Sequence, residues 1–123
     1  MANVALLQGK KVLVTGAARG LGRDFAQAIA EAGAQVVMAD ILDDRVQEVA
    51  IELQQRGLKV EAVKIDLADA VSIQQAVEQA VKYLGGLDGL VNCAALATNV
   101  GGKSLMDYDA DLWDRVMNIN VKG

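Results

Sequence analysis

The chain alternates between two kinds of apolar pattern, and this alternation restricts its possible folds more than any other feature. Four short runs, rich in valine and isoleucine or alternating in polarity, are typical of strands: 11–16, 35–40, 59–66 and 87–94. Four longer segments with apolar residues at spacings of three and four are typical of helices: 20–32, 43–56, 69–83 and one that begins near residue 109. Strands that alternate with helices pair in parallel through right-handed crossovers. The sequence therefore predicts a single α/β domain over residues 1–123.

The spacing of the large apolar residues predicts which face of each helix is buried. The predicted faces are Leu21, Phe25 and Ile29 in the first helix, Val46, Val49 and Leu53 in the second, and Ile73, Val77 and Val81 in the third. Each of these helices is followed by a glycine, at Gly33, Gly57 and Gly85, and glycine is the residue that most often ends a helix. Because aromatic residues make up only 3% of the chain, the core is expected to be aliphatic.

The composition argues against several classes of protein and several kinds of partner. The net charge is −4 and the charges are spread along the chain without a basic run, which argues against a nucleic-acid partner. There is no histidine and one cysteine, Cys93, so an internal disulfide is impossible and no metal site is predicted. The longest uncharged stretch, roughly 89–102, is too short to cross a bilayer, and the N-terminus does not resemble a signal peptide. A soluble cytoplasmic protein, with no membrane partner, is expected.

Three glycines crowd the turn between the first strand and the first helix, in the stretch TGAARGLG (15–22). Gly16 would allow the tight turn out of the strand, Gly20 would let a phosphate approach the backbone, and Gly22 would let the helix pack close to the sheet. The helix N-terminus offers free N–H groups and a positive dipole to a pyrophosphate. The pattern favours a nucleotide site. The alternative is a purely structural turn, because any tight strand-to-helix turn uses glycine.

Asp40 ends the second predicted strand, about 20 residues beyond the glycines, where a dinucleotide-binding fold places the acid that accepts hydrogen bonds from the adenosine ribose. A carboxylate there also repels a 2′-phosphate, which favours NAD over NADP. Arg19 argues the other way, because a basic residue before the middle glycine could pair with that phosphate, although it could equally be a solvated helix-start residue. Asp40 is in the more direct position, so NAD is predicted and NADP is less favoured. The alternative for Asp40 is a turn residue or a cap for the helix at 43.

The glycine spacing TGxxxGxG, taken with later stretches in order, resembles the classical short-chain dehydrogenase/reductase family over the whole chain. Asp66-Leu67, VNCAA (91–95) and WDRVMNINVKG (113–123) match further segments of that family. The resemblance implies a Rossmann-type doubly wound parallel sheet with strand order 3-2-1-4 and helices on both faces. It also implies these cofactor-binding residues: Thr15, Gly16, Ala18, Arg19, Gly20, Leu21, Gly22, Asp40, Ile41, Asp66, Leu67, Asn92, Cys93 and Ala94.

The resemblance also implies an activity, which is hydride transfer between a nicotinamide and the carbinol carbon of a secondary alcohol or ketone. The family uses an asparagine, a serine and a Tyr-x-x-x-Lys pair, and Asn120 stands at the position of that asparagine, which holds a water of a proton relay. The tyrosines here do not fit the pair, because Leu87 follows Tyr83 by four residues and Leu112 follows Tyr108.

We therefore expect the N-terminal half of a dehydrogenase, which carries most of the cofactor site and is inactive by itself. The alternatives are a non-catalytic dinucleotide-binding fragment and a half-domain that needs a C-terminal partner. The complete protein is expected to be a homo-oligomer that acts on a small-molecule alcohol or ketone.

Asn120 can also be interpreted without the family. Trp113, Val116 and Asn120 fall on one helix face, and an amide on an apolar stripe must find hydrogen-bond partners. The alternative to a relay role is thus a core amide that pins the helix, and both can hold.

The sequence departs from the family at Cys93, which replaces an asparagine, and at Ala95, which replaces a glycine near the expected nicotinamide ribose. Without a histidine to activate it, Cys93 is interpreted as a buried structural thiol. Ser72 is expected in a helix away from the cofactor edge. Ser104 is interpreted as a turn residue, and the alternative is a distant substrate contact.

Overall fold

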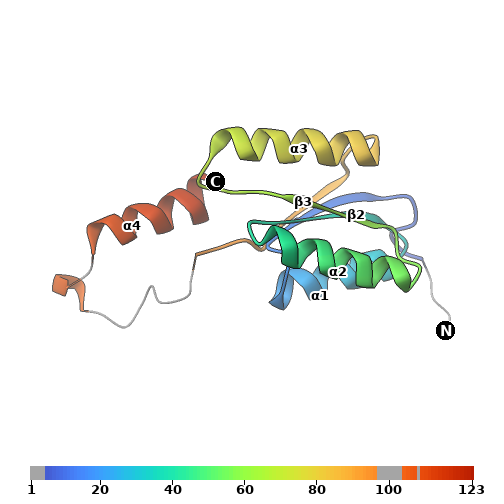
Figure 1. Ribbon diagram of the computed structural model, residues 1–123, viewed down its shortest axis with the longest axis horizontal. Coiled ribbons are helices and arrows are strands. Elements are labelled where there is room, and N and C mark those ends of the chain that lie inside the picture. Colours follow the sequence, from blue (N-terminus) through green and yellow to red (C-terminus); the bar gives the residue numbers. More distant parts are fainter. Residues whose placement is uncertain (1–4, 97–103, 108) are drawn as a thin grey trace.

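The computed structural model describes residues 5–96, 104–107 and 109–123. In chain order, the elements are β1 (Lys11–Thr15), α1 (Gly20–Glu31), β2 (Gln35–Asp40), α2 (Asp43–Gln55), β3 (Val60–Lys64), α3 (Ala70–Leu84), β4 (Gly89–Asn92), a 3-10 helix (Leu105–Asp107), α4 (Ala110–Met117) and a π-helix (Asn118–Lys122). Every strand and helix that the alternating pattern predicts is present (Figure 1).

The four strands form one parallel sheet in the order β3-β2-β1-β4, which confirms the predicted fold class and strand order. β3 and β4 are shorter than the predicted strands 59–66 and 87–94 because their partners end first. Lys64 is in register with Asp40, the last residue of β2, and Asn92 is in register with Thr15, the last residue of β1. The chain winds outward from β1 in both directions, so the carboxyl ends of β1 and β4 meet at the switch point where open α/β sheets bind ligands.

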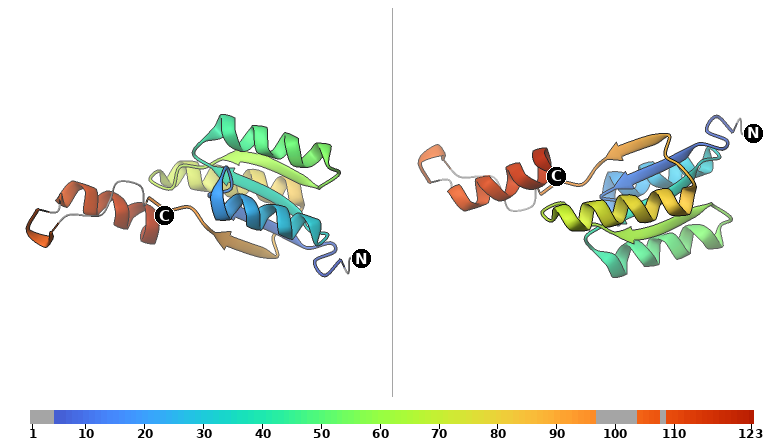
Figure 2. Two further views of the ribbon diagram at one scale, coloured as in Figure 1. Left: turned by 90° about the horizontal axis from the view of Figure 1, so that it is seen from below. Right: turned by 90° about the horizontal axis from the view of Figure 1, so that it is seen from above.

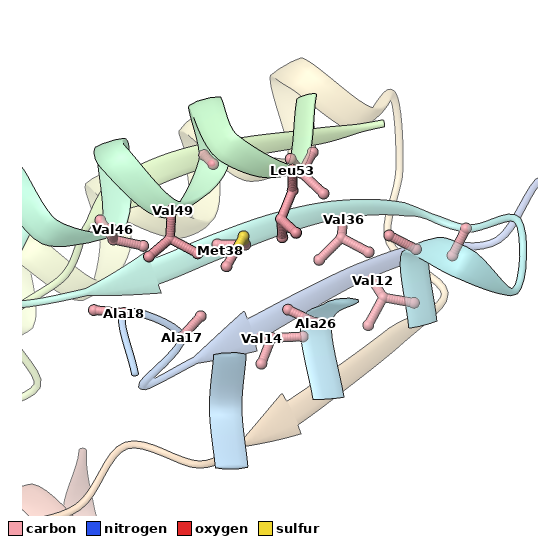
Figure 3. Close-up of a cluster of buried hydrophobic side chains, with 14 residues drawn as sticks. Val12, Val14, Ala17, Ala18, Ala26, Val36, Met38, Val46, Val49 and Leu53 are labelled. Atoms are coloured by element: carbon pink, nitrogen blue, oxygen red, sulfur yellow. The ribbon is translucent and has the colours of Figure 1, made fainter. Parts of the chain in front are cut away.

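α1 and α2 cover one face of the sheet and α3 covers the other (Figure 1). The larger core cluster lies against α1 and α2, and its fully buried members include Val14, Val36, Met38, Val46 and Leu53 (Figure 3). The smaller cluster lies against α3 and includes Leu13, Val37, Ala76, Ala80 and Leu84. Both clusters are aliphatic, as the composition predicts.

The predicted buried face of α1 is wrong. Leu21 and Phe25 are 69% and 43% exposed, and Ile29 is only partly buried against the core. The buried residues are instead Gly22, Ala26 and Ala30. A search by hydrophobicity selects the largest apolar side chains, but α1 lies so close to the sheet that only small side chains fit beneath it. This close packing places the N-terminus of α1 directly beside the end of β1.

The predicted face of α2 is correct and that of α3 is partly correct. Val46, Val49 and Leu53 are all buried under α2. In α3, Ile73 and Val77 pack partly against the core, whereas Val81 is 38% exposed. The residues that α3 buries fully are Ala76, Ala80 and Leu84.

The last helix begins near the predicted residue and changes its geometry toward its C-terminal end. Asp109 caps α4 by accepting a hydrogen bond from the Asp111 N–H at 2.9 Å. After Met117 the helix widens into a π-helix, in which the Gly123 N–H donates to the Asn118 carbonyl at 2.7 Å.

α4 projects beyond the carboxyl end of the sheet, as both views of Figure 2 show. It leaves Trp113 56% exposed and Val116 half-buried. β4 forms the outer edge of the sheet, where Leu90 is 53% exposed. Within the described parts of the chain, no helix is long and apolar enough to cross a membrane.

Candidate functional site

A cleft of about 480 Å³ opens at the carboxyl ends of β1, β2 and β4. Three segments line it: the glycine-rich turn, the residues after β2 and the residues after β4. The residues in this lining that the sequence predicts to bind a cofactor are Gly16, Arg19, Gly20, Leu21, Gly22, Asp40, Ile41, Cys93 and Ala94. The fold thus brings most of the predicted set to one place.

The three glycines of the turn have different surroundings. An added Cβ at Gly16, where φ is +67°, would lie 2.7 Å from the backbone nitrogen of Ala94, and one at Gly22 would collide with the carbonyl oxygen of Gly16. These two glycines are required by backbone packing. Gly20 has φ +60°, but no atom of the described residues lies within 4 Å of the position that its Cβ would take. Open space therefore lies over the backbone at the one glycine that is predicted to admit a phosphate.

The N-terminus of α1 faces the same cleft without a cap of its own. Arg19, the N-cap residue, has an extended backbone with φ −163° and ψ 172°, and its side chain makes no capping hydrogen bond. No acidic residue lies in the first turn. The positive end of the helix dipole is therefore not offset by a carboxylate of its own turn, which suits an anionic ligand.

Asp40 is 8% exposed, and its carboxylate joins two turns. Oδ2 accepts a hydrogen bond from the Ala18 N–H at 2.9 Å, and Oδ1 accepts one from the Leu42 N–H at 3.0 Å. Asp40 is thus a turn residue, which is one of the two alternatives to a ribose contact. The other alternative, a cap for the helix at 43, does not hold, because the N-cap residue of α2 is Leu42. Each carboxylate oxygen has a second lone pair, and Asp40 also lines the cleft, so its predicted bond to a ribose remains chemically possible.

Two residues of the predicted set lie behind the cleft instead of in its lining. Thr15 is 4% exposed, and its Oγ1 accepts hydrogen bonds from the N–H groups of Cys93 and Ala94 at 3.2 and 3.3 Å. Ala18 is fully buried in the larger core cluster (Figure 3), so its side chain faces away from any ligand. Both residues act on the cleft by holding its backbone.

Asp66, Leu67 and Asn92 do not line this cleft either. Asp66 Oδ1 accepts from the Ala68 N–H at 2.9 Å, and the Asp66 N–H donates to Ser72 Oγ at 2.9 Å. This bond places Ser72 at the carboxyl edge of the sheet, contrary to the expectation. Leu67 lines a separate hollow of about 120 Å³ beside the π-helix, and Asn92 is exposed at the end of β4.

The segment after β4 is held at its far end by Asn120. Its Oδ1 accepts from the Leu96 N–H at 2.7 Å, and its Nδ2 donates to the Leu96 carbonyl at 3.1 Å. Asn120 is exposed, so it is not a core amide, but it does pin the last helix. Cys93, in the same segment, is half-buried and lines the cleft, where the sequence predicts a buried thiol.

The remaining candidates for proton transfer lie elsewhere. Tyr83 lines a hollow at the amino end of the sheet, where burial and the neighbouring Glu61 carboxylate raise its pKa. A raised pKa is the opposite of what a tyrosine base requires. Ser104 donates to Asp107 Oδ2 at 2.7 Å within its own turn, in agreement with a turn role. Tyr108 lies outside the described residues.

The sequence model of the family described as short chain dehydrogenase matches residues 10–123. The chain belongs to the short-chain dehydrogenase family. An uncharacterised oxidoreductase of Thermotoga maritima is 39% identical over 118 residues, which are 96% of this chain and 45% of that protein. This short-chain dehydrogenase chain therefore spans less than half the length of that curated relative.

Solved structures of the family agree with the fold. A short chain dehydrogenase from Mycobacterium smegmatis has a TM-score of 0.90 and 36% identity, over 99% of this chain and 50% of that chain. A short chain dehydrogenase from Burkholderia cenocepacia, solved in complex with NADP, has a TM-score of 0.85 and 36% identity, over 95% of this chain and 47% of that chain.

Sequence reasoning missed Arg45 of this short-chain dehydrogenase chain. The side chain lines a hollow of about 510 Å³ that adjoins the cleft and shares Arg19 and Leu42 with it. Its Nε donates to the Ala18 carbonyl at 3.4 Å. The available signal was a basic residue in the first turn of the helix after Asp40, but its partner lies 27 residues away and no local rule identifies it.

Replacing Asn120 should loosen the segment after β4. Asn120→Ala removes both bonds to Leu96, each worth about 0.5–1.5 kcal/mol, so exchange of the Leu96 amide hydrogen is expected to accelerate about tenfold. Asn120→Asp keeps the oxygen that accepts from the Leu96 N–H but loses the bond to the Leu96 carbonyl, so its protection of that amide should lie between those of Asn120→Ala and the wild type. Hydrogen exchange followed by NMR measures both. Unchanged protection of Leu96 in Asn120→Ala would contradict the assignment.

Proposed function

We propose that this chain is the dinucleotide-binding part of an NAD-dependent short-chain oxidoreductase that transfers hydride between the nicotinamide and a secondary alcohol or ketone. The observation that carries the proposal is the geometry of the glycine-rich turn. Gly16 and Gly22 pack against backbone, Gly20 leaves open space, and the uncapped N-terminus of α1 lies beside it. Such a turn would offer its backbone N–H groups and the positive end of the helix dipole to a pyrophosphate.

The donor set around the cleft fits a dinucleotide. The backbone from Arg19 to Gly22 would hold the pyrophosphate, Asp40 would accept hydrogen bonds from the adenosine ribose, and the segment Cys93–Ala94 would lie against the nicotinamide side. When bound, the nicotinamide supplies a hydride donor or acceptor to the substrate carbon. The residues of this chain bind and orient the cofactor, and Asn120 fixes the last helix beside the cleft.

Asp40 also supports the choice of NAD. A ligand bearing a 2′-phosphate would place that phosphate against a carboxylate that is nearly buried, where charge repulsion is only weakly screened. Arg19 offers an opposite charge on the rim of the cleft, and the Burkholderia relative was solved with NADP. NADP is therefore the alternative cofactor against which NAD must be tested.

A second candidate function is dinucleotide binding without catalysis. It is supported by the absence of a Tyr-x-x-x-Lys pair in the 123-residue sequence and by the position of Tyr83 at the opposite end of the sheet. For residues 1–123, which we treat as one domain, binding alone is what we propose. The uncharged β4 edge and the exposed Leu90 support association with further chain or with other subunits of a homo-oligomer. The free thiol of Cys93, the one cysteine of the sequence, supports a cytoplasmic setting.

A matched pair of glycine substitutions tests the cleft. Gly20→Ala and Gly57→Ala both place alanine at a positive φ, +60° and +84°, where the described part of the chain has no atom within 4 Å of the added Cβ. Each should lower the free energy of unfolding by about 1–2 kcal/mol. Only Gly20→Ala should weaken NADH binding, by about tenfold or more, because Gly57 lies beyond the end of α2. Titration calorimetry at a temperature where both variants are folded measures this. Equal NADH affinity of the two variants would contradict the assignment of the cleft.

Parallel titrations with NADH and NADPH test the choice of cofactor. NADH should bind about tenfold or more tightly, because a charged hydrogen bond from the ribose to Asp40 is worth about 1.5–3 kcal/mol. Asp40→Asn should weaken NADH binding and reduce the preference. Asp24→Asn, an equal change of charge at an exposed position of α1, should do neither. A preference for NADPH in the wild-type chain would refute the choice of NAD.

Hydride transfer by the purified 123-residue chain is expected to be undetectable. NAD and a panel of secondary alcohols are incubated with the chain, and NADH fluorescence is followed against a blank without protein. The physical reason is that the described residues that line the cleft include no tyrosine and no lysine, so none of them can take the role of the family's Tyr-x-x-x-Lys pair. NADH formation that scales with protein concentration would show that the chain is catalytic by itself.

A further inference from the structure

The glycine-rich turn has an inner half and an outer half, which differ in burial. The inner half, Ala17 and Ala18, is fully buried in the larger core cluster (Figure 3). The outer half, Arg19 to Gly22, lines the cleft. A ligand can touch only the outer half, but the shape of that half depends on where the inner half is anchored.

Ala18 is the last residue of the inner half, and both of its backbone polar groups are held by side chains of neighbouring elements. Its N–H donates to Asp40 Oδ2 at 2.9 Å, at the end of β2. Its carbonyl accepts from Arg45 Nε at 3.4 Å, in the first turn of α2. Because Ala18 is fully buried, water has poor access to replace either partner.

The Ala18 carbonyl and the Arg19 N–H belong to the same peptide group. A trans peptide is planar, and its C=O and N–H point in opposite directions. The hydrogen bond from Arg45 therefore fixes the plane of this peptide and turns the Arg19 N–H away from α2. The next residue, Gly20, begins α1 at φ +60°. The orientation of the Ala18–Arg19 peptide therefore affects the direction in which the helix starts.

Charge around Arg45 argues against direct contact with a phosphate. The hollow that it lines contains Arg19 but also Asp43 and Asp44, so the four charges cancel. An anion placed there would face two carboxylates at the start of α2. Arg45 is thus better suited to hold the protein backbone than to hold a ligand.

We propose that Arg45 is a positioning residue for the dinucleotide. Through the carbonyl of Ala18, it holds the outer half of the glycine-rich turn in the conformation that faces the cleft. This inference rests on the proposed dinucleotide function and adds to it a residue that does not touch the ligand. A positioning role predicts that loss of Arg45 weakens the binding of NADH and NADPH alike, whereas a contact with the 2′-phosphate predicts a loss confined to NADPH.

The test compares three variants by calorimetric titration with NADH and with NADPH, at a temperature where melting curves show each variant folded. Arg45→Met keeps the approximate length of the side chain and removes its hydrogen-bond donors. It should lower the affinities for NADH and for NADPH by the same factor, about tenfold. Arg45→Lys keeps a donor and should recover part of that affinity. Arg56→Met, which removes the same charge from the exposed end of the same helix, should change neither affinity by more than about twofold.

The amide resonance of Arg19 gives a second measurement that needs no ligand. In the NMR spectrum of the free chain it should shift in Arg45→Met and in Arg45→Lys, and stay in place in Arg56→Met. Unchanged binding in Arg45→Met, or a loss confined to NADPH, would overturn the inference while leaving the proposed function intact. An Arg19 resonance that does not move would overturn it as well, even if Arg45→Met were too unstable to titrate. A wild-type chain that binds neither nucleotide would overturn the proposed function, and this inference with it.

Discussion

The carboxylate of Asp40 connects the two turns on which the candidate site depends. It is almost buried, and it accepts one hydrogen bond from the glycine-rich turn and one from the turn into α2. Hydrogen bonds to a charged acceptor contribute about 1.5–3 kcal/mol each, and a buried carboxylate without them would be strongly destabilising. The same oxygens border the cleft. A single side chain therefore fixes the backbone that would hold a pyrophosphate and presents the charge that would discriminate between ribose hydroxyls and a 2′-phosphate.

Close packing of small residues supplies the second part of the arrangement. α1 rests on the sheet through Gly22, Ala26 and Ala30, and nothing larger than hydrogen fits between Gly22 and the carbonyl of Gly16. The end of β1 is fixed in turn to the segment after β4, by Thr15 Oγ1 and by the contact of Gly16 with Ala94. The walls of the cleft are thus held by backbone contacts and buried hydrogen bonds, which is how a binding site is kept open before its ligand arrives.

The sequence predicted those features that depend on local chemistry. The strands, the helices, the different demands on Gly16 and Gly22, and the position of Asp40 at the end of β2 all follow from spacing, residue type and turn geometry. The buried face of α1 could not be found in this way, because hydrophobicity favours Leu21 and Phe25 whereas the packing distance requires glycine and alanine. The strand ends at Lys64 and Asn92 depend on where the partner strands stop, which a single strand does not encode. The bonds of Arg45 to Ala18 and of Asn120 to Leu96 join residues 27 and 24 positions apart, so only the folded chain reveals them.

We propose that the cleft beside the glycine-rich turn holds a dinucleotide. An amide NMR titration of the isotope-labelled chain with NADH tests it most directly, because each backbone N–H reports on its own surroundings. The largest shifts should fall on Arg19–Gly22, on Ile41 and Leu42, and on Cys93–Leu96, and the amino end of the sheet should be unaffected. Shifts confined to the hollow around Lys59, Glu61 and Tyr83, or no shifts at saturating NADH, would contradict it.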